Sequence, residues 1–413
     1  MLIARQELKG LQRTLPPIIN HVGSALFGNL VPPPADPLLA IIDAHRRDSR
    51  SNKIDVGVGV YRDADGRTPV LQAIKTAERR LLEQQESKSY IGAAGDVRFA
   101  ELLRPVIFGA AIASDRRIVG IQTPGGTGAL RLAVELVRRA RPDGTVHLGL
   151  PTWPVHHSVL AATGLTETTY PYFDLDTQTV QFDTMIGALA GAARGGAVLL
   201  QAACHNPTGA DLDMDQWRAV AEICAARGLV PIVDIAYQGL GDGLEEDVAG
   251  ARIVMGAVDE AIVTYSCDKN FGQYRDRVGA IYVKAGTPEQ GRIVQDYLQL
   301  TARAMWSMPP DHGAAAVRLV LEDAALTAQW QAELAAMRGR INDVRRTLAG
   351  IDVRLAPVAT QRGLFSTLPL GAERVARLAS EDAIYMAVPG RINIAGLRPD
   401  QVERFGRAIV AHL

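Results

Sequence analysis

Short apolar runs alternate with amphipathic helical patterns through the middle of the chain, and this alternation most constrains the fold. The apolar runs include residues 146–150, 197–203, 229–233, 261–265 and 278–283. The helical patterns include residues 129–139, 214–226 and 288–305. Apolar runs that are separated by helices are typical of strands buried on both faces. The sequence therefore predicts an α/β domain with a mostly parallel sheet sandwiched by helices.

The pattern changes near residue 323, after the alternating runs of the middle section. Residues 324–348 have a long helical pattern rich in Ala, Gln and Arg. We expect this helix to link the large domain to a smaller α+β domain at the C-terminus. That domain is expected to end with a strand over residues 391–395 and a helix over residues 398–413.

The charge balance argues against several classes of partner. The 44 basic residues nearly match the 45 acidic ones, so no global basic field favours nucleic acid or anionic lipid, although a local patch stays open. No stretch approaches the roughly 18 apolar residues of a membrane span. Three scattered cysteines favour neither a disulfide framework nor a metal site. We expect a cytoplasmic protein without a metal, whose cysteines are buried small hydrophobic residues.

Polar side chains follow the apolar runs at the point where each predicted strand ends. Asn206, Asp234 and Lys269 follow three of these runs, and Trp153 and His156 follow a fourth. Because ligands bind at the carboxyl ends of the strands in open α/β sheets, we expect these side chains to converge on one site.

A glycine-rich turn and a lysine suggest the chemistry of this site. Residues 123–128, which include Gly126 and Thr127, lead into a helical pattern and could hold a phosphate on backbone N–H groups, although such a turn is also often purely structural. Pyridoxal phosphate (PLP) needs a lysine for a Schiff base, a carboxylate for its ring nitrogen and a phosphate site. Lys269, Asp234 and the turn supply these three groups. A nicotinamide dehydrogenase is disfavoured, because residues 55–61 lack the third glycine and the following helix of the dinucleotide fingerprint.

From about residue 25 to its end, the sequence resembles the aspartate and aromatic amino-acid aminotransferases of PLP fold type I. The resemblance rests on an ordered set of motifs: Tyr90-Ile91-Gly92, Thr123-Pro124-Gly125-Gly126-Thr127-Gly128, Pro151-Thr152-Trp153-Pro154, Cys204-His205-Asn206-Pro207-Thr208-Gly209, Asp234-Ile235-Ala236-Tyr237-Gln238-Gly239, Lys269-Asn270-Phe271-Gly272, Arg277-Val278-Gly279 and Gly390-Arg391-Ile392-Asn393. It implies a large PLP-binding domain over residues 68–336 and a small domain over 37–67 and 337–413. We expect residues 24–36 to be an N-terminal arm and 1–23 a disordered extension.

The resemblance implies roles for the residues around the PLP ring. Lys269 would bind the cofactor and move the proton between the substrate and the cofactor. Asp234 would pair with the ring nitrogen, with His156 supporting it from behind. Asn206 and Tyr237 would hydrogen-bond the phenolic oxygen.

The phosphate site is also implied by the resemblance. Gly126, Thr127, Ser266 and Arg277 would bind the phosphate, and Tyr90 would reach it from the neighbouring subunit. The resemblance therefore implies a homodimer whose active sites are shared between subunits.

The resemblance likewise implies how substrates bind. Trp153 would stack on the PLP ring and contact the substrate. Arg391 would bind the α-carboxylate, with hydrogen bonds from Gly59 and Asn206. Arg303 of the partner subunit would bind the side-chain carboxylate of aspartate or glutamate.

Two residues depart from the family pattern. Many relatives carry a phosphate-binding serine at the position of Asp268, whose carboxylate we expect to turn toward Arg275 or Arg277 instead. Many aspartate-selective relatives carry asparagine at the position of Met308, near the side-chain end of the substrate. Methionine is less polar and more adaptable, which favours aromatic substrates as well as dicarboxylates.

These observations predict an amino-acid:2-oxoglutarate aminotransferase that uses PLP in a ping-pong mechanism on aromatic amino acids, aspartate or both. A strict aspartate aminotransferase is the nearest alternative. Another fold type I enzyme, such as a β-lyase or decarboxylase, is a second, although the paired Arg391 and Arg303 disfavour it. A regulator on the same fold is a third, although the N-terminal segment is too short for a DNA-binding domain.

Overall fold

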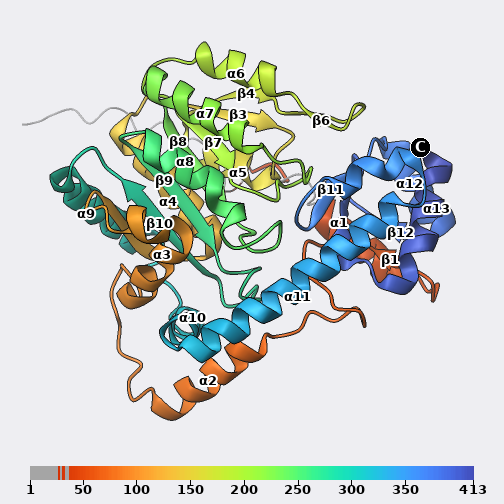
Figure 1. Ribbon diagram of the computed structural model, residues 1–413, viewed down its shortest axis with the longest axis horizontal. Coiled ribbons are helices and arrows are strands. Elements are labelled where there is room, and N and C mark those ends of the chain that lie inside the picture. Colours follow the sequence, from red (N-terminus) through yellow and green to blue (C-terminus); the bar gives the residue numbers. More distant parts are fainter. Residues whose placement is uncertain (1–26, 28–29, 33–36) are drawn as a thin grey trace, which may run out of the picture.

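A computed structural model describes residues 27, 30–32 and 37–413 of the chain. The extension expected over residues 1–23 and most of the arm expected over 24–36 lie outside the described residues. Figure 1 shows a larger sheet-containing body and a smaller one, with the long helix α11 (Ala324–Ala349) running from the first to the second. Within the described part, no helix is long and apolar enough to cross a membrane.

A seven-stranded sheet forms the centre of the larger body (Figure 1). Only β10 runs antiparallel to its neighbours, and the remaining pairs of the sheet are parallel. This confirms the predicted α/β fold with a mostly parallel sheet. Across the sheet the strands are β2 (Ile118–Pro124), β10 (Val278–Lys284), β9 (Ala261–Ser266), β8 (Val230–Ile235), β7 (Ala197–Gln201), β3 (Thr145–Leu150) and β4 (Thr166–Pro171).

Helices cover both faces of this sheet, and each face has its own hydrophobic core. Ile232 and Ile262 pack into one core, whereas the next residues along the same strands, Val233 and Val263, pack into the other. This is the alternation expected of strands buried on both sides. One face carries α4 (Gly125–Ala140), α5 (Pro154–Thr163) and α9 (Pro288–Met305). The other carries α3 (Val97–Ala113), α6 (Phe182–Ala190), α7 (Met214–Arg227) and α8 (Ala249–Ala257). α2 (Gln72–Gln84) and α10 (His312–Glu322) pack beside α11.

The ends of α7 show how local sequence sets the helix boundaries. The Asp213 carboxylate accepts a hydrogen bond from the Gln216 N–H at 2.8 Å, and the Gln216 side chain accepts one from the Asp213 N–H at 3.0 Å. At the other end, Gly228 takes a left-handed conformation with φ of 60°. A capping box and a C-terminal glycine therefore bracket the helix that the sequence predicts.

Small sheets and helices make up the smaller body (Figure 1). β1 (Ile54–Asp55) pairs with β12 (Ile384–Tyr385), and β11 (Phe365–Thr367) pairs with β13 (Arg391–Asn393). The short hairpin of β5 (Phe173–Asp174) and β6 (Thr179–Val180) belongs to the large-sheet region of the sequence. The remaining helices of this body are α1 (Pro37–Arg47), α12 (Ala372–Asp382) and α13 (Val402–His412).

Several predicted boundaries were wrong, and three of them have a clear local cause. β7 ends at Gln201 rather than 203, because the chain turns away and Cys204 takes a φ of 57°. β13 ends at Asn393 rather than 395, because residues 394–396 form a 3₁₀ turn. The last helix starts at Val402 rather than 398, because it is preceded by a 3₁₀ turn that opens with Pro399, which has no N–H to donate.

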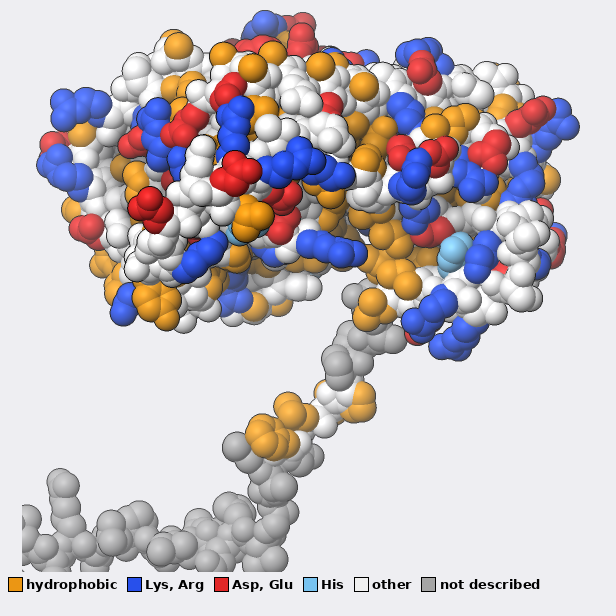
Figure 2. All heavy atoms as spheres, turned by 90° about the horizontal axis from the view of Figure 1, so that it is seen from below, with side chains coloured by type: hydrophobic (Ala, Val, Ile, Leu, Met, Phe, Trp, Pro, Cys, Tyr) orange, Lys and Arg blue, Asp and Glu red, His pale blue; other side chains and the backbone are white. Residues whose placement is uncertain are grey.

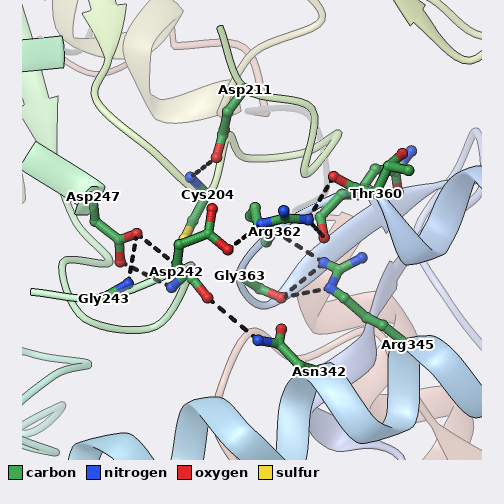
Figure 3. A network of polar contacts seen from close by, with 12 residues as sticks. Cys204, Asp211, Asp242, Gly243, Asp247, Asn342, Arg345, Thr360, Arg362 and Gly363 are labelled. Atoms are coloured by element: carbon green, nitrogen blue, oxygen red, sulfur yellow. Dashed lines mark hydrogen bonds and ion pairs between the residues drawn. The ribbon is translucent and has the colours of Figure 1, made fainter. Parts of the chain in front are cut away.

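A buried polar network fixes the loop after β8, which carries part of the cavity described below. The Asp247 carboxylate accepts hydrogen bonds from four backbone N–H groups, those of Gly239, Gly241, Asp242 and Gly243. Figure 3 shows this loop beside α11 and the 360–363 segment, with the Asp242 carboxylate 2.6 Å from Nε of Arg362. Buried Arg345 of α11 donates to carbonyl groups of the same segment, including that of Gly363 at 2.8 Å. The larger and smaller bodies are therefore joined through the loop that also carries Ala236 and Tyr237 of the cavity lining.

Candidate active site

A cavity of about 220 Å³ lies at the carboxyl ends of β7, β8 and β9. The strands lead directly into it, as the rule for open α/β sheets predicts. It is lined by Gly126, Thr127, Trp153, Gln201, Asn206, Asp234, Ala236, Tyr237, Ser266, Asp268, Lys269, Tyr274 and Arg277. Nine of the residues that the sequence predicts to form the site are therefore brought together here.

Lys269 follows β9 by three residues and points its amine into this cavity. Its Nζ lies 5.2 Å from the centre of the Tyr237 ring. Burial lowers the pKa of Lys269, although the carboxylates of Asp268 and Asp234 oppose this effect. A lower pKa leaves a larger fraction of the amine uncharged and nucleophilic near neutral pH.

Asp234, at the end of β8, is held in place from two sides. Its Oδ1 accepts a hydrogen bond from the Thr264 hydroxyl at 2.7 Å. Fully buried His156 places Nε2 3.5 Å from Asp234 Oδ2, close but without a well-aligned hydrogen bond, and its Nδ1 lies 2.7 Å from the Thr152 hydroxyl. The structure thus places His156 behind Asp234, where the sequence predicts it.

Asn206 and Tyr237 lie together on another side of the cavity. Nδ2 of Asn206 donates to the Tyr237 hydroxyl at 3.4 Å, while Oδ1 of Asn206 is buried without a partner. A pair of hydrogen bonds between the Gln201 side chain and the Asn206 backbone, at 2.9 and 3.0 Å, fixes the loop after β7. Burial raises the pKa of Tyr237, so its phenol stays protonated and able to donate.

The glycine turn forms the opposite end of the cavity. α4 begins at Gly125, four residues before the predicted start, so Gly126 and Thr127 lie in its first turn, where backbone N–H groups lack helical partners. A Cβ on Gly126 would lie 2.9 Å from Cβ of Ser266, so only glycine fits against β9. Arg277 forms an ion pair with Asp268, which confirms that Asp268 turns toward Arg277.

Three predicted substrate-binding residues lie outside the cavity lining, and two of them, Arg391 and Gly59, lie against Phe365. Nη2 of Arg391 donates to the Gly57 carbonyl at 3.0 Å, and its guanidinium carbon lies 4.8 Å from the centre of the Phe365 ring. Burial lowers the pKa of Arg391, and Nε is buried without a partner. Gly59 also packs on Phe365, since a Cβ there would lie 2.6 Å from Cζ. The Phe365 ring contacts the Tyr237 ring edge-on, with 6.1 Å between the ring centres. This contact links Arg391 and Gly59 to the cavity.

Tyr90 and Arg303 are not near this cavity. The Tyr90 side chain is 91 % exposed, and Arg303 is exposed at the end of α9. Neither residue lines the cavity of its own chain.

Two residues of the site, Thr264 and Gln201, were not predicted. Thr264 lies opposite Asp234 in the register of β8 and β9, and Gln201 ends β7. Both belong to apolar runs, where a polar residue among hydrophobic ones is the only signal in the sequence. Tyr274, for which the sequence predicts a place at the active-site wall or the dimer seam, lines the cavity and accepts a hydrogen bond from the Tyr61 N–H at 3.0 Å.

An enzyme built on PLP fold type I is the class of protein that this sheet and this cavity define. The chain belongs to the aminotransferase class I and II family, which it matches over residues 51–409. It is therefore a PLP-dependent transaminase. The fold and cofactor that the sequence predicts are both confirmed.

Named relatives and a solved structure resemble the chain over nearly its whole length. A tyrosine aminotransferase of Rhizobium meliloti is 50 % identical and aligns with 90 % of this chain and 96 % of its own. An aromatic-amino-acid aminotransferase of Pseudomonas aeruginosa is 44 % identical over 93 % of this chain and 98 % of its own. The structure of an aromatic-amino-acid aminotransferase from Burkholderia pseudomallei, covalently bound to pyridoxal phosphate, superposes with a TM-score of 0.91 at 36 % identity and covers 94 % of this chain and all of the other.

Proposed function

We propose that the protein transfers amino groups from aromatic amino acids and aspartate to 2-oxoglutarate. The reaction is ping-pong: the amino acid gives up its amino group and leaves before the 2-oxo acid binds and takes it. One observation supports this chemistry most directly. Lys269, whose pKa is lowered, lines the same cavity as Asp234 and the N-terminus of α4. Activity on aromatic amino acids draws support from the names of the two similar relatives.

The described residues fit PLP. The buried and unpartnered Oδ1 of Asn206 gives the cavity a polar atom that seeks a partner. The turn at Gly126 and the hydroxyl of Ser266 offer a phosphate the donors that it needs at a helix N-terminus. Asp234 would pair with the ring nitrogen and Trp153 with a face of the ring. Nδ2 of Asn206 and the Tyr237 hydroxyl would donate to the phenolic oxygen.

When bound, PLP supplies an electron sink for the negative charge that develops at the substrate Cα. The uncharged Lys269 amine would accept the proton from Cα and deliver it to the aldehyde carbon of the cofactor, on the other side of the amino nitrogen. The Asp234 carboxylate, kept in position by Thr264, favours a protonated ring nitrogen. Tyr237 stays protonated and donates a hydrogen bond.

Arg391 would bind the substrate α-carboxylate. Its stacking on Phe365 and its bond to the Gly57 carbonyl fix the plane of the guanidinium group. The buried Nε without a partner leaves a donor for a planar anion, and a carboxylate accepts two parallel bonds from such a fork. Gly59 and Asn206 would add hydrogen bonds to the same group.

We propose a homodimer in which Tyr90 and Arg303 act in the partner's site. Ile293, Tyr297 and Leu300 lie on one face of α9 and are 56 %, 43 % and 57 % exposed. An exposed apolar face of this kind is typical of a protein interface. Because Arg303 ends the same helix and does not line its own cavity, pairing along this face would carry it toward a second chain.

Arg303→Ala is expected to lower kcat/KM for aspartate by about 10²-fold, because a charge-assisted hydrogen bond to the side-chain carboxylate is lost. The value for phenylalanine is expected to change by less than about threefold, because an aromatic ring makes no such bond. Steady-state kinetics with both substrates measure the two ratios. Equal losses on the two substrates would refute the role of Arg303.

Mixed subunits supply the control for action across the interface. In a hybrid of Arg303→Ala and Lys269→Ala chains, one of the two sites combines an intact Lys269 with the partner's intact Arg303. Co-expression is expected to restore about a quarter of the wild-type aspartate activity, given random pairing into dimers. If Arg303 served its own chain, no site would be complete and no activity would return.

Met308 supports the broader substrate range. Its sulfur accepts a hydrogen bond from the Ile91 N–H at 3.2 Å, so it packs on the segment that carries Tyr90. In the proposed dimer this places a flexible apolar side chain near the partner's site, beside Arg303.

We further propose that residues 37–67 and 337–413 form the small domain and 68–336 the large domain. The pairing of β1 with β12 supports this division, because it joins the N-terminal segment to the C-terminal one. A cytoplasmic location is proposed from the three cysteines, Cys204, Cys224 and Cys267, which are all free and buried. Figure 2 shows positive and negative side chains interspersed over one face of the molecule, in keeping with the nearly balanced charge.

A further inference from the structure

Asp268 is a buried carboxylate in the cavity to which the proposed chemistry gives no role. It precedes Lys269 and is 3 % exposed. Its Oδ2 is paired with Nη1 of Arg277, and its Oδ1 is buried without a hydrogen-bond partner. A carboxylate with one satisfied oxygen in a closed site is unfavourable unless a nearby charge offsets it.

The Asp268–Arg277 pair lies directly against the turn that opens α4. A Cβ on Gly125, which has a φ of 72°, would lie 2.6 Å from Nη2 of Arg277 and 3.2 Å from Oδ2 of Asp268. The backbone N–H of Asp268 also reaches the Ser266 hydroxyl at 3.3 Å. The Asp268 carboxylate thus lies at the end of the cavity that also contains the hydrogen-bond donors of Ser266, Arg277 and the helix N-terminus.

The side chains that line the cavity supply no excess of positive charge. Lys269 and Arg277 are its two basic residues, Asp234 and Asp268 are its two acidic residues, and burial disfavours the charged form of Lys269. A phosphate monoester brings a further charge of about −1.5 to −2 near neutral pH. Arg277 is the only guanidinium group in this lining, and one of its donors is already directed to Asp268.

We propose that Asp268 is a positioning residue that competes with the cofactor phosphate for Arg277. This competition makes PLP bind more weakly than it would without the Asp268 carboxylate, and it acts only on a ligand that has a phosphate. This inference rests on the proposed phosphate site. Asp268 holds Arg277 against the glycine turn, so the phosphate must share that guanidinium with a carboxylate of the same sign as its own.

The test compares PLP with pyridoxal, which has the same ring and aldehyde but no phosphate. The full-length protein is loaded with one of the two ligands and dialysed to equilibrium against known free concentrations of it. The absorbance of the bound ligand then gives the free concentration at which half of the sites are occupied. The variants are Asp268→Ser and the isosteric Asp268→Asn. Asp276→Ser is the matched control, since Asp276 lies in the same loop and does not line the cavity.

Both Asp268 variants are expected to bind PLP about tenfold more tightly or better, because a like charge beside the phosphate is removed. Their pyridoxal affinity should change by less than about twofold, as should both affinities of the control. Unchanged or weaker PLP binding would overturn the proposal, as would an equal change for the two ligands. If the wild-type protein bound neither ligand, the phosphate site of the proposed function would itself be wrong. That result differs from a change in the ratio of the PLP and pyridoxal affinities, which tests the role of Asp268.

Discussion

Lys269→Ala is expected to lower kcat with any amino donor by roughly 10⁴-fold, because both the covalent attachment point and the proton-transferring amine are lost. The effect should appear in each half-reaction, measured separately by rapid mixing with an amino acid or a 2-oxo acid. Folding should not suffer. Burial lowers the pKa of Lys269, so its charged form is disfavoured in the folded protein, and replacing it removes that cost.

Lys75→Ala is the matched control, because Lys75 is exposed on α2 and lies outside the cavity. It should keep wild-type kcat and the same unfolding temperature. A Lys269→Ala protein that kept more than about a tenth of the wild-type kcat would contradict the assignment of the lysine as nucleophile and base.

Arg391→Lys is expected to lower kcat/KM by about 10² to 10³-fold for every substrate, aromatic or dicarboxylic. Lysine keeps the positive charge but cannot present two parallel donors to the α-carboxylate, and its flexible chain would not stack on Phe365. Because every substrate has an α-carboxylate, the loss should not depend on the side chain. This distinguishes Arg391 from Arg303, whose replacement should affect mainly aspartate.

Arg377→Lys is the control for this change, since Arg377 lies on the exposed face of α12 in a solvent-exposed pair with Glu381. It should alter kcat/KM by less than about twofold. A comparably small effect of Arg391→Lys would show that the α-carboxylate binds elsewhere.

The sheet could be predicted because strands buried on both faces leave uninterrupted apolar runs. Residues 146–150 and 261–265 both lie within strands of the structure. The antiparallel direction of β10 could not be predicted, because a buried strand has the same apolar pattern whether it runs parallel or antiparallel to its neighbours. Boundaries at Gln201 and Asn393 were missed for a similar reason, since apolar residues continue past the point where the backbone turns.

The cavity could be predicted in part from position alone. Asp234 lies at the end of β8 and Lys269 follows β9 by three residues, and the sheet brings them to one edge. Thr264 was missed because it lies inside a strand, and its contact with Asp234 depends on register. The proposed roles of Tyr90 and Arg303 came from family resemblance only, since residues that act across an interface leave no local pattern.

The most direct test of the central claim is an absorbance spectrum of the purified protein between roughly 300 and 500 nm, before and after adding aspartate or, in a separate sample, phenylalanine. The aldehyde and amine forms of the cofactor absorb at different wavelengths. We expect both amino acids to convert the bound cofactor to its amine form, which shows transamination of aromatic and dicarboxylic donors by one site. Conversion by aspartate alone would contradict the broad substrate range and the role given to Met308. A bound cofactor that neither amino acid converts would contradict the proposed aminotransferase reaction itself.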